Sequence, residues 1–475
     1  MRRKSFLSSS SAAASPATEA RTGVRILYAP HFPAIFGRRK KSLSPESAKI
    51  LYHRPDEDPA ATGPEKNRSP EQEGGGHGRA HGHTLYPEPR TRQQPAEKDK
   101  QVKDEMEINA DKGALQRELT FLQSVTEKKS GKTGTPVLSN VLLHAEAPDR
   151  LRITATDNSV TLITEIEAEV VKAGSALVIA DKLFQLTKQL PAGVVNVQHE
   201  TNDRVRFTLE EIVCRLVGAP ADSFPAIPQA KTPAIDIPAE VLRTMIEFVI
   251  FARTSETSRF ALSSVKFVVE PRAALMVATN GARLSFIRTT TVTSKEKVTV
   301  LLPGKALTEL ARLAAAHEGS IGFATDENHA YFAVGHRTLI TTLTAGQFPD
   351  YRAVIPKEND CVLKVGAGAL LESVNRVGLV ATDQYHRIVF KLGVGGLALS
   401  SDAGEVGDAR ERISAEYEGS PIEIGFNACY LQDFLAAVGG ADLTVKFKDE
   451  KTQVEFTPAL PAIYSGRYIV SPVRA

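Results

Sequence analysis

Tryptophan is absent from this 475-residue chain, and cysteine is scarce. The three cysteines, Cys214, Cys361 and Cys429, are odd in number, far apart and outside any CxxC spacing. This pattern argues against a disulfide framework and against a zinc or other metal site, so a reducing compartment is expected. Long apolar runs are missing too, since no stretch approaches the roughly 18 uninterrupted apolar residues that a membrane helix needs. We therefore expect no membrane partner.

The chain also has little net charge, +2 at pH 7, and that charge is unevenly spread. Residues 1–105 hold 19 Lys and Arg against 13 Asp and Glu, which leaves the remaining body about four charges negative. Tight binding to phosphates usually requires a clearly basic domain. Any contact with nucleic acid must therefore be local or loose.

Residues 1–105 have little apolar periodicity. They mix Arg and Lys pairs, Ser and Ala runs, glycines and scattered prolines, a composition that cannot offset the entropy lost on ordering. The basic, Ser-rich start resembles a transit peptide only superficially, because acidic residues follow soon. We expect residues 1–105 to be either a disordered extension or sequence upstream of a true start at Met106. His77, His81 and His83 could bind a metal, but a run of His and Gly in such a segment is more often incidental.

From Met106 onward the sequence repeats itself with a period of about 123 residues. A strand that runs into an Asp, Asn or Gly turn recurs at Leu151–Asn158, at Leu275–Gly281 and, more faintly, at Leu397–Gly404. A strand, a turn and a helix also recur, with residues of types that favour helix N-caps at Asp181, Gly304 and Asn427. A Phe-Pro segment closes the first two units, at Ser223–Pro228 and Gln347–Pro356. The chain therefore predicts three similar units.

Each unit opens with an amphipathic helix, because apolar residues spaced by three and four fall on one helix face. These residues are Leu115, Leu119 and Leu122, then Val241, Leu242, Met245 and Phe248, then Leu370, Leu371, Val374 and Val377. Together with the alternating strands, each unit predicts an α+β domain whose two helices cover one face of an antiparallel sheet. We expect the domains at 106–228, 229–357 and 358–475.

This threefold arrangement resembles the bacterial beta sliding clamp, the beta subunit of DNA polymerase III. The resemblance spans Met106 to Ala475 and rests on four motifs in the family's order, Ala278–Leu284, Phe348–Arg352, Glu423–Asn427 and Tyr468–Ala475. It implies three tandem clamp domains per chain, and a homodimer in which two chains close head to tail into a ring, with helices lining the hole and sheets outside.

The same resemblance implies a function and its partners. The expected protein is a non-catalytic processivity factor that encircles double-stranded DNA without reading its sequence and needs no cofactor. Its expected partners are the DNA polymerase III alpha subunit, the clamp loader, and other replication and repair proteins that carry clamp-binding motifs. The expected localisation is cytoplasmic, at the nucleoid.

A partner-peptide pocket between the second and third domains is carried over by motif. Its residues would be Leu262, Thr279, Gly281, Arg283, Leu284, Pro349, Val354, Tyr385, Asn427, Tyr430, Val470, Ser471, Pro472, Val473 and Arg474. Apolar walls would take the Leu or Phe anchors of a short linear motif, while Arg283 and Asn427 would offer hydrogen bonds. By spacing alone, Leu284, Val354 and Val473 are better explained as core residues, and only the resemblance places them in a pocket. The chain departs from the family at Ala282, Ser471 and Ala475, where His, Met and Leu are common, which predicts a shallower pocket floor.

The expected DNA-facing residues are few. The resemblance aligns Lys132, Arg259 and Phe260 with positions that touch DNA, and the helices and their ends add Lys112, Arg117, Lys128, Lys182, Lys188, Arg243, Arg253, Lys305, Arg312 and Arg376. A few non-specific phosphate contacts suit a ring that must slide. For any single Lys, solubility is an equally good explanation.

For the ring contact, the family pairs an edge strand of the first domain with a helix of the third. Here that rule indicates Cys214 and Leu216 against Leu379 and Val380. Edge pairing combined with apolar packing suits a head-to-tail contact that closes.

Two other classes of function fit parts of the sequence. Gly131-Lys132-Thr133 looks like the end of a phosphate-binding loop, but Thr126 stands where that loop needs its first Gly, and the tripeptide follows a helix where a strand is required. Neither GxSxG nor HExxH occurs. A divergent clamp-fold platform that binds partners off DNA is the second alternative, and it would lose the inner basic residues that are present here.

Overall fold

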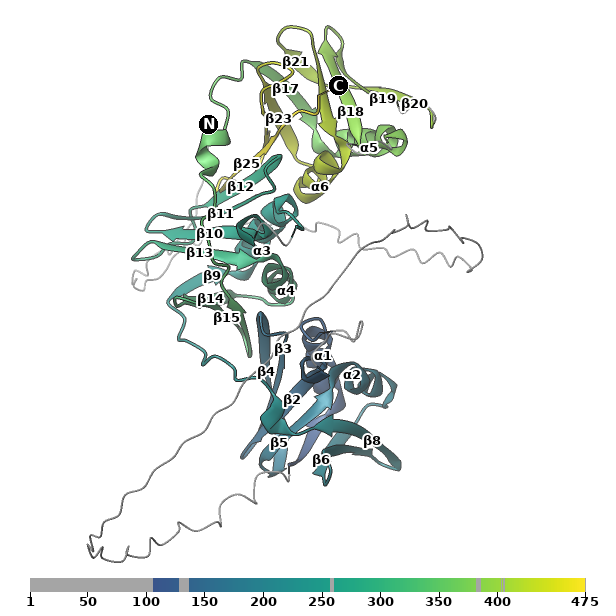
Figure 1. The fold of residues 1–475 in the computed structure, drawn as a ribbon, viewed down its shortest axis with the longest axis vertical. Coiled ribbons are helices and arrows are strands. Elements are labelled where there is room, and N and C mark those ends of the chain that lie inside the picture. The colour runs from purple at the N-terminus through teal and green to yellow at the C-terminus, as the bar shows by residue number, and fades with distance from the viewer. Residues whose placement is uncertain are drawn as a thin grey trace, which may run out of the picture. The chain divides into compact units, whose positions relative to one another are not determined.

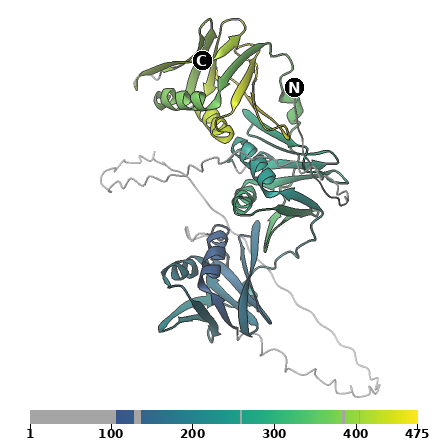
Figure 2. The same ribbon diagram turned by 180° about the vertical axis from the view of Figure 1, so that it is seen from behind.

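The computed structural model describes residues 106–127, 136–256, 260–381, 386–402, 404 and 406–474, so the extension expected over residues 1–105 lies outside the described residues. Within them, helices occur in pairs, and each pair covers its own sheet strands (Figures 1 and 2). The pairs are α1 (Lys112–Leu122) with α2 (Ala180–Gln189), α3 (Ala239–Val249) with α4 (Gly304–Ala315), and α5 (Ala367–Val377) with α6 (Ala428–Val438).

The strands follow the same threefold plan. The first repeat has β1 (Glu107–Asp111), β2 (Asn140–Glu146), β3 (Arg150–Thr156), β4 (Val160–Lys172), β5 (Gly174–Ile179), β6 (Val194–Glu200), β7 (Arg204–Leu209) and β8 (Ile212–Ala219). The second has β9 (Ile235–Pro238), β10 (Ser264–Glu270), β11 (Ala273–Thr279), β12 (Arg283–Thr289), β13 (Val298–Pro303), β14 (Ser320–Thr325), β15 (His329–Val334) and β16 (Arg337–Thr342). The third has β17 (Cys361–Gly366), β18 (Arg387–Gly393), β19 (Gly396–Asp402), β20 (Asp408–Ile413), β21 (Glu416–Glu418), β22 (Ile422–Asn427), β23 (Asp442–Phe447), β24 (Val454–Pro458) and β25 (Tyr464–Val470).

The sheets cross from one repeat to the next. β4 of the first repeat pairs antiparallel with β16 of the second, with Thr164 opposite Arg337. In the same way β12 of the second repeat pairs antiparallel with β25 of the third, with Arg283 opposite Val470. At both junctions the fourth strand of one repeat meets the last strand of the next. Backbone hydrogen bonds therefore join the repeats within the chain.

The predicted helix faces are confirmed. Leu115, Leu119 and Leu122 of α1 are at most 2% exposed, and the apolar faces of α3 and α5 enter the same core. Only Leu371 of the predicted set in α5 is half-buried. The recurrent strands before each turn are β3, β11 and β19, as the repeat predicted.

The helix N-caps were predicted less well. Asn427 does cap α6, because its side-chain oxygen accepts the Tyr430 N–H at 3.1 Å. Asp181 and Gly304 are not caps, since α2 begins at Ala180 and α4 at Gly304. In both cases the preceding strand runs directly into the helix, so the first helical residue comes earlier than the residue types suggest. Asp181 lies in the first turn, where a carboxylate favours the helix dipole.

The Phe-Pro segment after β16 covers the second repeat's sheet on the side away from its helices. The ring of Tyr351, in the short helix η5 (Tyr351–Val354), stacks on Phe286 of β12 with centroids 5.9 Å apart. Tyr351 joins Leu284, Val277 and Ile469 in a buried cluster separate from the main core. This segment therefore seals the sheet beside the β12–β25 junction.

Candidate functional site

The β11–β12 turn brings four of the predicted pocket residues together. The Thr279 hydroxyl donates to the Arg283 carbonyl at 2.6 Å and accepts the Gly281 N–H at 3.1 Å. Leu284 follows on β12 and is 2% exposed. Val470 lies beside this turn because β25 pairs with β12. The hairpin and the last strand thus form one rigid corner of the predicted pocket.

The chain's C-terminal segment extends this corner into the third repeat. The Ser471 N–H donates to the Ala282 carbonyl at 2.9 Å, and the Val473 N–H donates to the Gly425 carbonyl at 2.8 Å. Residues 471–473 therefore span from the second repeat to β22 of the third. Pro472 lies between these two contacts, and Arg474 beyond them is exposed.

The remaining predicted pocket residues lie on separate segments. Val354 of η5 is 43% exposed, and Pro349 precedes it in the Phe-Pro segment. Leu262 belongs to η4 (Phe260–Ser263), and its carbonyl accepts the Thr254 N–H at 3.0 Å. Tyr430 lies on α6, where its hydroxyl accepts a hydrogen bond from the Asn280 amide at 3.2 Å. Tyr385 falls outside the described residues.

Arg283 has a role that the sequence did not indicate. Its side chain is 8% exposed, its Nη1 donates to Asp433 Oδ2 at 2.7 Å, and its Nη2 donates to the Phe251 carbonyl. The guanidinium also lies 4.3 Å from the centroid of the Tyr430 ring. Both terminal nitrogens of Arg283 are therefore engaged within the chain, where they tie the second repeat to α6. A bound peptide would meet the walls around Arg283.

Burial at this corner also affects a tyrosine. Tyr468 of β25 is fully buried, its hydroxyl donates to the Tyr430 carbonyl at 2.9 Å, and its ring stacks on Phe434 with centroids 4.4 Å apart. Burial raises the pKa of Tyr468 well above its ordinary value. The hydroxyl therefore stays protonated and serves as a structural donor.

The basic residues predicted to face DNA fall into two groups. Lys112 and Lys182 stand near the starts of α1 and α2, and the side chain of Lys182 is exposed. Arg253 follows the short helix η3 (Ile250–Ala252) and packs over Gly304 at the start of α4, where a Cβ would come within 2.4 Å of its Nε. Phe260 opens η4, and Lys128, Lys132 and Arg259 lie outside the described residues.

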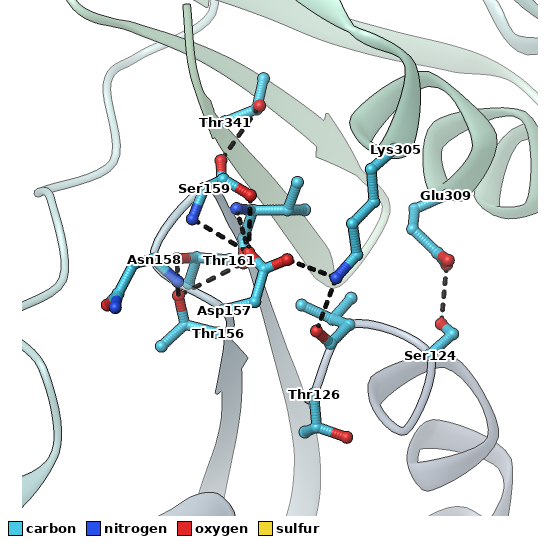
Figure 3. Close-up of polar contacts among 12 residues, drawn as sticks. Ser124, Thr126, Thr156, Asp157, Asn158, Ser159, Thr161, Lys305, Glu309 and Thr341 are labelled. Carbon is cyan, nitrogen blue, oxygen red and sulfur yellow. Dashed lines mark hydrogen bonds and ion pairs between the residues drawn. The ribbon is translucent and has the colours of Figure 1, made fainter. Parts of the chain in front are cut away.

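Lys305 and Arg312, both on α4, instead bind the first repeat. Lys305 Nζ donates to Asp157 Oδ2, as Figure 3 shows, and also to the Val125 carbonyl at 3.1 Å. Arg312 donates to the Thr120 and Phe121 carbonyls at the end of α1. Burial alone would raise the pKa of Asp157, but Lys305 and the turn's N–H groups lower it below its ordinary value. These two cations hold repeats together and are less available to DNA.

The predicted ring-contact residues are accessible. Leu379 of η6 (Gly378–Val380) is 78% exposed, and Val380 is half-buried. Cys214 and Leu216 on β8 are half-buried, whereas Val213 and Val217 on the same strand are 51% and 62% exposed. Across the described ranges no cluster of three or more His, Cys, Asp or Glu side chains could hold a metal ion, and no helix is long and apolar enough to cross a membrane.

Sequence reasoning missed several residues that build these sites. The sequence predicts Asp157 and Asn280 only as turn residues, and it gives no signal at Asp433. The recurrence of Asp or Asn at the same turn of each repeat was the available signal, but its meaning depends on partners that only the fold supplies.

Comparison with protein families supports the repeat structure. Residues 107–228 match a model described as the DNA polymerase III beta subunit N-terminal domain, residues 236–350 match its central domain, and residues 352–459 match its C-terminal domain. The chain is 31% identical over 358 residues to the beta sliding clamp of Treponema pallidum, covering 72% of this chain and 93% of that protein. It is 28% identical over 379 residues to the beta sliding clamp of Pseudomonas putida, covering 78% of this chain and all of that protein.

Solved structures agree. The crystal structure of the DNA polymerase III subunit beta from Pseudomonas aeruginosa superposes with a TM-score of 0.72 at 28% identity, covering 78% of this chain and all of that one. The DNA polymerase sliding clamp of Bacillus subtilis gives a TM-score of 0.73 at 22% identity, a likeness of fold alone.

Proposed function

Because the chain belongs to the DNA polymerase III beta subunit family and is therefore a DNA sliding clamp, we propose that it acts as a homodimeric ring with its partner site between the second and third clamp domains. A sliding clamp is a non-catalytic processivity factor of replication. The rival platform that binds partners off DNA has no support from the related proteins. Such a protein works in the cytoplasm, at the nucleoid.

Ring closure follows from the way repeats already join within the chain. The fourth strand of one repeat pairs with the last strand of the next, in β4–β16 and in β12–β25. Within the described residues, this rule leaves two strands without such a partner: β20, the fourth strand of the third repeat, and β8, the last strand of the first. β20 is an edge of its sheet. One edge of β8 pairs with β7, and the other edge pairs with β5 only through the last two residues of β8. β20 of one chain therefore pairs with β8 of the second, and two such contacts close the ring.

Apolar packing would seal this contact. The exposed Val213 and Val217 of β8, with Leu379 next to α5, leave apolar surface that a second chain would cover. Cys214, Leu216 and Val380 accompany them on the same two segments. Burying such side chains on association is favourable, because it removes their apolar surface from water.

Replication partners would bind beside Leu284 and the C-terminal segment. The DNA polymerase III alpha subunit, the clamp loader and repair proteins carry short motifs with apolar anchors, and the exposed Val354 and the wall formed by residues 471–473 suit such anchors. DNA itself would be held loosely through Lys112 and Arg253, with the undescribed Lys132 and Arg259 expected to join them. The one observation that carries the partner site is the C-terminal segment bonded to both repeats, at Ala282 and Gly425.

The test is peptide binding by a chain that lacks residues 471–475. Anisotropy of a labelled clamp-binding pentapeptide should report an affinity roughly thirtyfold lower, since a hot-spot wall is typically worth about 2 kcal/mol. Val354→Ser should weaken binding in the same direction, whereas Val394→Ser, at an exposed turn between β18 and β19, should not. Unchanged binding by the truncated chain, with its dimer intact, would move the partner site elsewhere.

A further inference from the structure

One side-chain hydrogen bond recurs after the second long strand of each repeat, where an Asp or Asn oxygen accepts the N–H of the residue two positions further on. In the first two repeats the same side chain also contacts the following repeat. In the first repeat Asp157 Oδ1 accepts the Ser159 N–H at 2.9 Å, and this bond closes the turn between β3 and β4. Its other oxygen, Oδ2, accepts Lys305 Nζ from α4 of the next repeat, as Figure 3 shows. A single carboxylate thus shapes its own turn and binds the following repeat.

The second repeat uses the same geometry with a neutral side chain. Asn280 Oδ1 accepts the Ala282 N–H at 3.0 Å and closes the turn between β11 and β12. Its Nδ2 donates to the Tyr430 hydroxyl on α6 of the third repeat at 3.2 Å. In both repeats, therefore, the polar side-chain atom that does not close the turn forms a hydrogen bond with a residue in the first turn of the following repeat's second helix.

Asp402 has the corresponding position in the third repeat, where β19 and β20 are joined by residues 403–407, a connection two residues longer than in the first two repeats. Its Oδ1 accepts the Gly404 N–H at 3.0 Å, again from two residues further on. Asp402 is exposed, and no hydrogen bond or ion pair within the described part of the chain engages its second oxygen. In the proposed ring β20 pairs with β8 of a second copy, so the helix that this oxygen would meet is α2 of that copy.

The first turn of α2 offers one cation, Lys182. Lys182 and Lys305 are both exposed, and each directly precedes two buried residues, Leu183–Phe184 in α2 and Ala306–Leu307 in α4. Relative to the buried face, Lys182 therefore has the same position on α2 that Lys305 has on α4. Among the residues that the structure describes, its Nζ has only a long contact to Gln185 Oε1, at 3.4 Å.

The second acceptor of Lys305 also has a counterpart. Lys305 donates to the carbonyl of Val125, three residues after Leu122, the last buried residue of α1. Three residues after Val377, the last buried residue of α5, stands Val380. An incoming ammonium at this contact would therefore find a carboxylate and a backbone carbonyl, as Lys305 does.

From this repetition we propose that Asp402 forms an ion pair with Lys182 of the partner subunit, and that the Val380 carbonyl is the second acceptor. The inference rests on the proposed ring and adds the residues that determine which surfaces of two chains meet. It also assigns Lys182 to the contact between chains, not to DNA. Each ring contains this pair twice, so a change at either residue acts at both contacts.

The test is a charge exchange in the full-length chain. Asp402→Lys and Lys182→Glu each place like charges together at both contacts, which should raise the dimer dissociation constant by about 100-fold or more. The double variant Asp402→Lys with Lys182→Glu restores opposite charges and should recover the dimer to within about tenfold of the original. Lys188→Glu, an exposed cation elsewhere on α2, is the matched control and should leave the constant unchanged.

Sedimentation at several concentrations, with fluorescence measurement of subunit exchange, gives these constants. The proposed ion pair would be wrong if both single variants kept the original dimer dissociation constant. It would also be wrong if the single variants weakened the dimer and the double variant did not recover it. If Lys182→Glu shortened retention on circular DNA while leaving the dimer constant unchanged, Lys182 would be a DNA contact instead. Failure of the ring itself is distinguishable, because Val213→Asp would then also leave the dimer intact.

Discussion

Glu118 shows how one side chain can join two repeats. It lies on α1, is 3% exposed, and accepts both Arg337 Nε and Nη2 at 2.6 Å from β16. The Thr164 hydroxyl and the His336 ring complete its contacts at 2.7 Å and 3.1 Å. Burial alone would raise the pKa of Glu118, but these donors lower it below its ordinary value of 4.5. The carboxylate is therefore charged at neutral pH.

We expect Glu118→Gln to destabilise the chain by about 3 kcal/mol at pH 7, because Arg337 would remain buried without its counter-charge. A group whose pKa is lowered by folding contributes stability above its unfolded pKa, and this stability is lost as pH falls through the folded pKa. The difference between the two proteins should therefore be full at pH 7 and shrink below about pH 4.5. Urea unfolding at several pH values measures it.

The control for Glu118 replaces both partners. Glu118→Leu with Arg337→Leu removes the pair without leaving a lone charge, so its stability should lie much closer to that of the original chain. Equal losses in the single and double variants would mean that the ion pair is not what stabilises this junction.

For single residues, the sequence predicted their positions in the fold better than their roles. Arg283 was predicted in the turn motif and lies there, but its ion pair with Asp433 joins residues 150 positions apart. No local pattern contains such a contact. The buried Leu284 illustrates the same limit, because apolar spacing alone could not distinguish a pocket wall from a core residue.

Among the elements, β8 and β20 are strands with open edges. Open edges attract further strands, and proteins usually protect them. β8 exposes Val213 and Val217, and β20 carries alternating charges that include Asp408 and Arg410. An apolar edge strand left uncovered would promote aggregation, so a specific second chain is the natural cover for β8.

We expect Val213→Asp to give monomers, because it places a charge in an apolar contact where losing its hydration is costly. Leu379→Asp should act in the same way on the other side of the contact, and both side chains are exposed enough that the monomer should still fold. Leu216→Asp is a poorer test, since Leu216 packs against the core of its own repeat. Sedimentation velocity separates the two species.

Val394→Asp is the matched control for these edge variants. Val394 is a fully exposed valine at the turn between β18 and β19, outside both open edges, so its change should leave the dimer intact. Dimers that persist in Val213→Asp and Leu379→Asp alike would place the contact on other elements.

Element prediction succeeded where the signal was local. The amphipathic faces of α1, α3 and α5 and the strands before each turn follow from periodicity within about ten residues. The pairing of β4 with β16 and of β12 with β25 could not be read that way, because it depends on which strand edges remain free after each repeat folds. Helix starts also shifted, since β5 and β13 enter α2 and α4 without an intervening loop.

For the whole molecule, the described fold begins at Met106, which is part of the first repeat's core. Its side chain is fully buried, and its carbonyl accepts the His199 N–H at 2.8 Å. β1 then pairs with both β4 and β6, and Asp111 at its end caps α1 through the Ala114 N–H at 2.7 Å. The family match likewise begins at residue 107. The described part of the first repeat therefore begins with a residue that is buried and hydrogen-bonded within it.

We expect a chain that starts at Met106 to melt within about 2 °C of the full chain and to keep its dimer constant and peptide affinity, because a change well under 1 kcal/mol moves a domain of this size by no more than that. A chain that starts at Lys112 is the matched control. It loses β1 and the α1 cap, exposes the edges of β4 and β6, and should fail to form a stable first repeat. Thermal unfolding followed by circular dichroism, with sedimentation at the same concentration, compares the three chains. A substantially less stable or monomeric Met106 chain would show that residues 1–105 contribute to the clamp after all.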